Sequence, residues 1–126
     1  MAAVSAPHVV LGAAGGTGSA VVRELVARGL PVRAVTRSGT ADVPEGVERV
    51  AADIASPAGP RQACDGAVVV YHCAQPDYTK WVALFPPLTA AVLDGAAAAG
   101  AKLVFAERDQ RASQVLEVVE RMGLVE

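Results

Sequence analysis

Three glycines spaced three residues apart are the feature of this sequence most able to do chemistry. They are Gly12, Gly15 and Gly18, preceded by the apolar run His8–Leu11 and followed by a helical pattern from Thr17. In such a turn the first glycine permits a tight bend, the second lets the backbone approach a phosphate, and the third lets helix and strand pack closely. The helix then begins with N–H groups and a positive dipole end that face an anion. The segment predicts a site for the pyrophosphate of a dinucleotide; a glycine-rich turn with no ligand is the alternative.

Composition limits the class of protein. The chain has 126 residues, of which 52% are hydrophobic and 19% charged, so we expect one folded domain and not a disordered chain. A net charge of −2 gives no reason to propose nucleic acid or an anionic membrane as a partner. Two cysteines make a disulfide framework improbable, and no segment approaches the ~20 apolar residues of a membrane span. We therefore expect a cytoplasmic protein.

Apolar strand patterns alternate with helical patterns along the chain. Strands are expected at His8–Leu11, Pro31–Thr36, Val47–Ala51, Ala67–Cys73 and Lys102–Ala106. Helices are expected at Thr17–Arg28, Pro57–Cys64, Leu88–Ala99 and Asp109–Met122, whereas Tyr78–Phe85 is ambiguous. This alternation predicts an α/β fold with a doubly wound parallel sheet of about five strands in the order 3-2-1-4-5, with helices on both faces.

Residues 8 to 106 resemble the first half of an extended or atypical short-chain dehydrogenase/reductase, the NAD-dependent epimerase/dehydratase family. Five motifs in order support this: Gly12-Ala13-Ala14-Gly15-Gly16-Thr17-Gly18, Val35-Thr36-Arg37-Ser38, Ala52-Asp53-Ile54, Tyr71-His72-Cys73-Ala74-Gln75-Pro76 and Ala101-Lys102-Leu103-Val104-Phe105. The resemblance implies a single NAD(P)-binding Rossmann domain over residues 1–126, with the ligand across the carboxyl ends of the strands. Residues 107–126 would be a divergent C-terminal helix.

The end of the second strand bears on the choice of cofactor. An NAD site usually has Asp or Glu there, which accepts hydrogen bonds from the ribose hydroxyls. This sequence has Thr36-Arg37-Ser38 instead, and the next acid is Asp42. Because an arginine attracts a 2′-phosphate, NADP(H) is favoured over NAD(H). The alternative is that Arg37 is only a solvated loop residue.

Other site residues are implied by the resemblance. Asp53 either accepts from the adenine amino group or caps the following turn, and Ile54 packs nearby. Cys73 is expected to be inert, as a buried strand cysteine usually is. The full cofactor-binding set is Gly12, Gly15, Gly16, Thr17, Gly18, Arg37, Ser38, Asp53, Ile54, Cys73, Ala74 and Gln75. His8 and His72 have no metal-ligand spacing, so no metal site is expected.

The sequence departs from the family in its catalytic residues. Oxidoreductases of the family have a Tyr-x-x-x-Lys pair on the helix after the fifth strand, in which the tyrosine is the acid or base. Here that region has neither residue, and Tyr78-Thr79-Lys80 has the wrong spacing for one helical face. We assign no catalytic residue, and expect an NADP(H)-binding domain without a complete active site.

Two alternatives remain. One is an oxidoreductase or epimerase completed by a partner subunit, in a homo- or hetero-oligomer. The other is a non-catalytic nucleotide-sensing or interaction module that docks through the helix Asp109–Met122. For that helix, packing on the chain's own sheet is the favoured interpretation.

Overall fold

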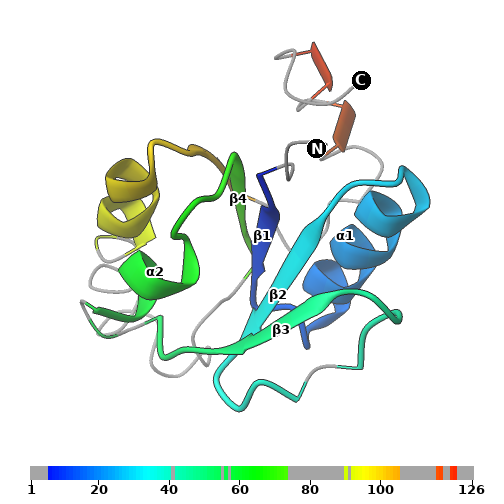
Figure 1. The fold of residues 1–126 in the computed structure, drawn as a ribbon, viewed down its shortest axis with the longest axis horizontal. Coiled ribbons are helices and arrows are strands. Elements are labelled where there is room, and N and C mark those ends of the chain that lie inside the picture. The colour runs from blue at the N-terminus through cyan, green and yellow to red at the C-terminus, as the bar shows by residue number, and fades with distance from the viewer. Residues whose placement is uncertain are drawn as a thin grey trace, which may run out of the picture.

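One parallel sheet organises the chain (Figure 1). The computed structural model describes residues 6–40, 42–54, 56, 58–73, 90, 92–105, 116–117 and 120–121. Within them, five strands are hydrogen-bonded in the order β3-β2-β1-β4-β5, which confirms the predicted fold class. The strands are β1 (His8–Leu11), β2 (Val32–Thr36), β3 (Glu48–Ala51), β4 (Val69–His72) and β5 (Lys102–Phe105).

The central strand β1 fixes the register of its neighbours. His8 lies opposite Val32 of β2 and Val69 of β4, and Leu11 lies opposite Val35 and His72. Every residue of β1 and β4 is buried, as expected for parallel strands covered on both faces. The carboxyl ends of all five strands therefore meet at one edge of the sheet.

Helices cover both faces of this sheet. Helix α1 (Gly16–Ala27) lies on one face, and α2 (Ala58–Ala63) lies with the helical residues 92–99 on the other (Figure 1). The helix α1 begins and ends one residue earlier than predicted. Pro60 is accommodated in α2 because it lies in the first turn, where a helix makes no use of the N–H groups.

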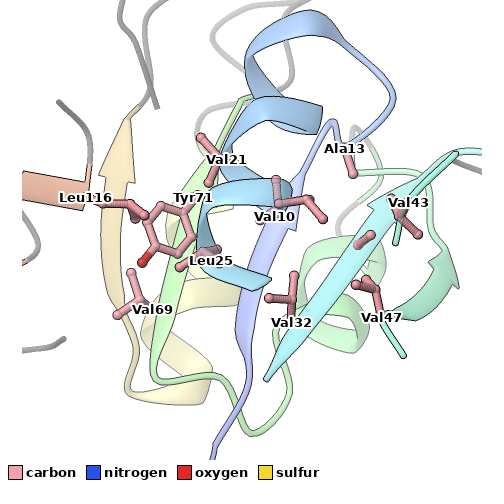
Figure 2. Close-up of a cluster of buried hydrophobic side chains, with 12 residues drawn as sticks. Val10, Ala13, Val21, Leu25, Val32, Val43, Val47, Val69, Tyr71 and Leu116 are labelled. Carbon is pink, nitrogen blue, oxygen red and sulfur yellow. The ribbon is translucent and has the colours of Figure 1, made fainter. Parts of the chain in front are cut away.

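Two separate hydrophobic cores result. The core beneath α1 comprises Val10, Ala13, Val21, Val22, Leu25, Val32, Ala34, Val43, Val47, Val69, Tyr71 and Leu116 (Figure 2). The core beneath α2 comprises Val9, Leu11, Val35, Ala63, Cys64, Ala67, Val70, Val92 and Ala96. Adjacent residues of β1 thus contribute to opposite cores, as the alternation of side chains along a strand requires.

The described part of the C-terminal segment packs on the α1 face. Residues 116–117 and 120–121 are helical, within the predicted helix Asp109–Met122. The side chain of Leu116 is fully buried beside Tyr71 (Figure 2), and Glu120 forms an ion pair with Arg28, the C-cap residue of α1. Leu116 therefore packs into the chain's own core beneath α1.

Three polar side chains are buried in the central strands. The Nδ1 atom of His8 is 2.9 Å from the Tyr71 hydroxyl, and the two rings stack with centroids 5.8 Å apart. Burial lowers the pKa of His8, raises the pKa of Tyr71, and lowers the pKa of His72 to about 4. In the folded protein both histidines therefore remain neutral to a lower pH than in the unfolded chain, where a histidine binds a proton near pH 6.5.

This difference predicts a loss of stability in mild acid. Because the unfolded chain binds more protons, the stabilisation is complete above about pH 6.5 and is lost as the pH falls toward 4. Between pH 7 and pH 5, His72 alone should lower the free energy of unfolding by roughly 2 kcal/mol. Urea unfolding at both pH values measures this change. The variant His72→Gln should have a clearly shallower pH dependence, and an unchanged dependence would contradict the assignment.

Candidate functional site

The turn between β1 and α1 is fastened to the end of β2. The backbone N–H groups of Gly12 and Ala13 both donate to the carbonyl oxygen of Val35, at 3.1 and 3.2 Å. Gly12 has a φ of +79°, which favours glycine, and its carbonyl accepts the N–H of Gly15 at 3.2 Å. The glycine turn is thus held in place by β2 and closed on itself before the helix begins.

Gly18 is required by packing. A Cβ atom at this position would lie 2.8 Å from the carbonyl carbon of Gly12 and 3.0 Å from the Cα of Ala13. Both neighbours are backbone atoms that cannot move aside without displacing the turn. Glycine at position 18 therefore lets α1 lie directly against the turn, the role expected for the third glycine of the motif.

Gly15 and Gly16 have no comparable packing reason. A Cβ at Gly15 would meet only the Gly12 carbonyl oxygen, at 3.6 Å, and one at Gly16 would meet no atom within 4 Å. Gly15 has φ −75° and ψ 169°, a conformation open to any residue, and both glycines are exposed. Gly15 is also the N-cap of α1 and provides no side-chain cap. These two glycines leave bare backbone at a helix N-terminus, where an anion binds favourably.

The residues after β2 form the second part of the site. Arg37 and Ser38 are exposed and follow directly on Thr36, the last residue of β2. Two arginines of the sheet and α2 are engaged: Arg33 donates to Glu48 and to the carbonyls of Ala63 and Asp65, and Arg61 pairs with Asp94. Among the described residues Arg37 has no such partner. Arg37 thus lies exposed at the carboxyl edge of the sheet.

The third part of the site follows β3. Asp53 is exposed, and its carbonyl oxygen accepts the N–H and the hydroxyl of Ser56 at 3.1 and 2.8 Å. The Ser56 hydroxyl oxygen in turn accepts the N–H of Gly59 at 3.2 Å, so Ser56 caps α2. Ile54 is half-buried and packs against the core beneath α2. Ser56 is not among the residues predicted for the site, although a serine followed by a proline is a common signal for the start of a helix.

The fourth part follows β4. The N–H of Cys73 donates to the carbonyl of Leu11 at 3.0 Å, and the side chain is half-buried. Burial raises the pKa of the Cys73 thiol to about 12, so it stays protonated at neutral pH and is a poor nucleophile. Ala74 and Gln75, which the resemblance also implicates, lie outside the described residues.

The sheet brings these four segments to one edge. The glycine turn follows β1, Arg37 and Ser38 follow β2, Asp53 and Ile54 follow β3, and Cys73 follows β4. Thr17, the remaining predicted residue, is half-buried in the first turn of α1. A helix N-terminus, an exposed arginine and the carboxyl ends of adjacent parallel strands are the components of a dinucleotide-binding Rossmann domain.

The chain belongs to the NAD(P)H-binding family whose model matches residues 12–117. The match includes the glycine turn, the strands β2, β3, β4 and β5, and the helical residues 116–117. Together with the similar solved structures, it confirms the resemblance to epimerase/dehydratase-type proteins that the sequence motifs indicated. No curated protein sequence matches the chain significantly.

Several solved structures have the same fold. A candidate epimerase from Bacteroides thetaiotaomicron is 25% identical, with a TM-score of 0.64 over 92% of this chain and 57% of that one. UDP-glucose 4-epimerase is 18% identical, with a TM-score of 0.68 over 93% and 46% of the two chains. Vestitone reductase from alfalfa is 21% identical, with a TM-score of 0.63 over 79% and 35%. The chain thus spans 57% or less of the length of each of these proteins.

Two properties of the described residues bear on the class of site. No group of three or more His, Cys, Asp or Glu side chains in that part of the chain is arranged to hold a metal ion. No helix there is both long and apolar enough to cross a membrane.

The two kinds of glycine predict opposite effects on stability. Gly18→Ala should lower the free energy of unfolding by at least about 2 kcal/mol, because the new Cβ overlaps backbone atoms. Gly16→Ala should leave it unchanged or raise it by up to about 1 kcal/mol, because alanine is the better helix former and has open space. Urea unfolding of the two variants measures both effects. Equal destabilisation by both substitutions would show that position 16 also serves packing.

Proposed function

We propose that this chain binds NADP(H) in preference to NAD(H), with the pyrophosphate over the first turn of α1. The observation that supports this is the pair Gly15 and Gly16, two exposed glycines for which the fold has no packing need. Bare backbone N–H groups and the positive end of the helix dipole suit a pyrophosphate. The adenosine half would then extend toward the ends of β2 and β3, and the nicotinamide half toward the end of β4.

The preference for a 2′-phosphate rests on Arg37. A carboxylate at the end of β2 would accept from the ribose hydroxyls and repel a phosphate, whereas a guanidinium binds a phosphate through two parallel hydrogen bonds. Ser38 adds a hydroxyl beside it. Asp42, the next acid, is exposed farther along the loop. Asp53 and Ile54 would contact the adenine, and Cys73, Ala74 and Gln75 would line the nicotinamide ribose.

We also propose that the chain has no complete acid/base apparatus of its own. The 126 residues contain no Tyr-x-x-x-Lys sequence. Tyr71 is fully buried beneath α1, bonded to His8, and its pKa is raised by burial. Lys102 begins β5, at the opposite edge of the sheet from the site. Tyr78 and Lys80 lie outside the described residues.

A second candidate function is an oxidoreductase or epimerase whose acid/base residues come from another polypeptide segment. The observation that favours it is the similarity to reductases and epimerases of which this chain spans only part. The two candidates share the same cofactor site and differ in turnover. A partner subunit in a homo- or hetero-oligomer would supply the missing residues. Binding without turnover would equally suit a nucleotide-sensing module.

The cofactor preference predicts the outcome of a titration. Calorimetry of the wild-type chain should give tighter binding of NADPH than of NADH. Arg37→Ala should weaken NADPH binding by roughly 10- to 100-fold, the worth of a charge-assisted hydrogen bond or two, and change NADH binding by less than about threefold.

Arg23→Ala is the matched control, since Arg23 is an exposed arginine on the outer side of α1. It removes the same charge from elsewhere and should leave both affinities nearly unchanged. Equal affinity of the wild-type chain for the two cofactors would contradict the proposed preference, and failure to bind either would contradict the proposed function.

A further inference from the structure

The turn that presents Arg37 is held by the side chain of the residue before it. Thr36 is half-buried at the end of β2, and its Oγ1 atom accepts the backbone N–H of Gly39 at 2.8 Å. The carbonyl oxygen of Thr36 accepts the N–H of Ala52 at 3.0 Å, which ties the same residue to the end of β3. The carbonyl of Thr36 thus holds the start of the turn against β3, and its hydroxyl holds the end of the turn at Gly39.

The far side of this turn is also fixed. Gly39 has a φ of +74°, and a Cβ placed on it would lie 3.1 Å from the Cβ and 3.3 Å from the N of Ala51. The hydroxyl oxygens of Ser38 and Thr40 are 2.6 Å apart, and the N–H of Thr40 points to the Ser38 hydroxyl at 3.4 Å. The turn is closed by its own hydroxyl groups and rests on β3.

The glycine turn after β1 is held by Val35, the residue of β2 that precedes Thr36. The Val35 carbonyl accepts from Gly12 and Ala13, and the Thr36 hydroxyl accepts from Gly39. Successive residues of β2 thus set the backbone on which the pyrophosphate is proposed to lie and the backbone from which Arg37 projects. The end of β2 therefore fixes the distance between the glycine turn and the backbone of Arg37.

We propose that Thr36 is a positioning residue for specificity, acting through Arg37 to distinguish dinucleotides with a 2′-phosphate from those without one. This inference rests on the proposed function. The Thr36 hydroxyl already accepts a hydrogen bond from Gly39 within the turn, so Thr36 would act on the ligand only through the position of Arg37. An arginine on an unrestrained loop attracts any nearby phosphate, including the pyrophosphate that both cofactors share. A fixed backbone lets the guanidinium meet the 2′-phosphate with less loss of conformational entropy on binding.

The test compares NADPH with NADH, which differ only in that phosphate. Thr36→Val keeps the branched shape suited to a strand and removes only the hydroxyl. It should weaken NADPH binding about five- to tenfold, the loss of one hydrogen bond's worth of positioning, with less than about a twofold change for NADH. Thr36→Ser restores the hydroxyl and should restore the wild-type ratio of affinities. Urea unfolding of each variant shows that the fold is retained.

A double variant separates this role from a merely structural one. If Thr36 acts through Arg37, then Thr36→Val should have no further effect on NADPH binding once Arg37→Ala is present. An equal loss of affinity for both cofactors, an unchanged ratio, or a full effect of Thr36→Val without Arg37 would each overturn the inference. A wild-type chain that does not prefer NADPH would instead overturn the proposed function on which the inference rests.

Discussion

The carbonyl group of Val35 is the point on which the arrangement of the site depends. It accepts two backbone N–H groups, from Gly12 and Ala13, and so fastens the turn after β1 to the end of β2. The strand that makes this contact is itself held in register along its whole length by β1 and β3. The start of α1 and the position of Arg37 are consequently set by hydrogen bonds of the buried sheet rather than by flexible loops.

With the turn fixed in this way, its glycines fall into two groups. Gly12 and Gly18 are explained by the backbone, the first through its positive φ and the second through close contact with the turn. Gly15 and Gly16 are not explained by the fold, and at Gly16 a helix would gain from a better helix former. Positions that lower stability without a packing reason are where a ligand requirement is expected. The glycine motif therefore combines an architectural part with a part we assign to the dinucleotide.

The sequence predicted the sheet order and all five strands. The central strands β1 and β4 are covered on both faces and have apolar runs such as His8–Leu11, whereas the largely exposed β3 (Glu48–Ala51) was located by the turn signals that precede it. The segments at the carboxyl edge could also be predicted, because the residues that follow the strands of a parallel sheet all lie at the same edge. The sequence did not predict which side chains are already engaged. The Ser56 cap and the Thr36 bond to Gly39 depend on side-chain hydroxyls whose partners are set by tertiary geometry.

The proposed position of the pyrophosphate is tested most directly by NADPH binding to the variant Gly15→Asp, with the stability of the variant measured alongside. Aspartate fits the backbone conformation of Gly15, caps α1 and interacts favourably with the helix dipole, so the variant should be as stable as the wild type or more so by a few tenths of a kcal/mol. Its carboxylate would occupy the place proposed for the pyrophosphate, and NADPH binding should be lost. A stable Gly15→Asp chain that still binds NADPH with wild-type affinity would contradict the account.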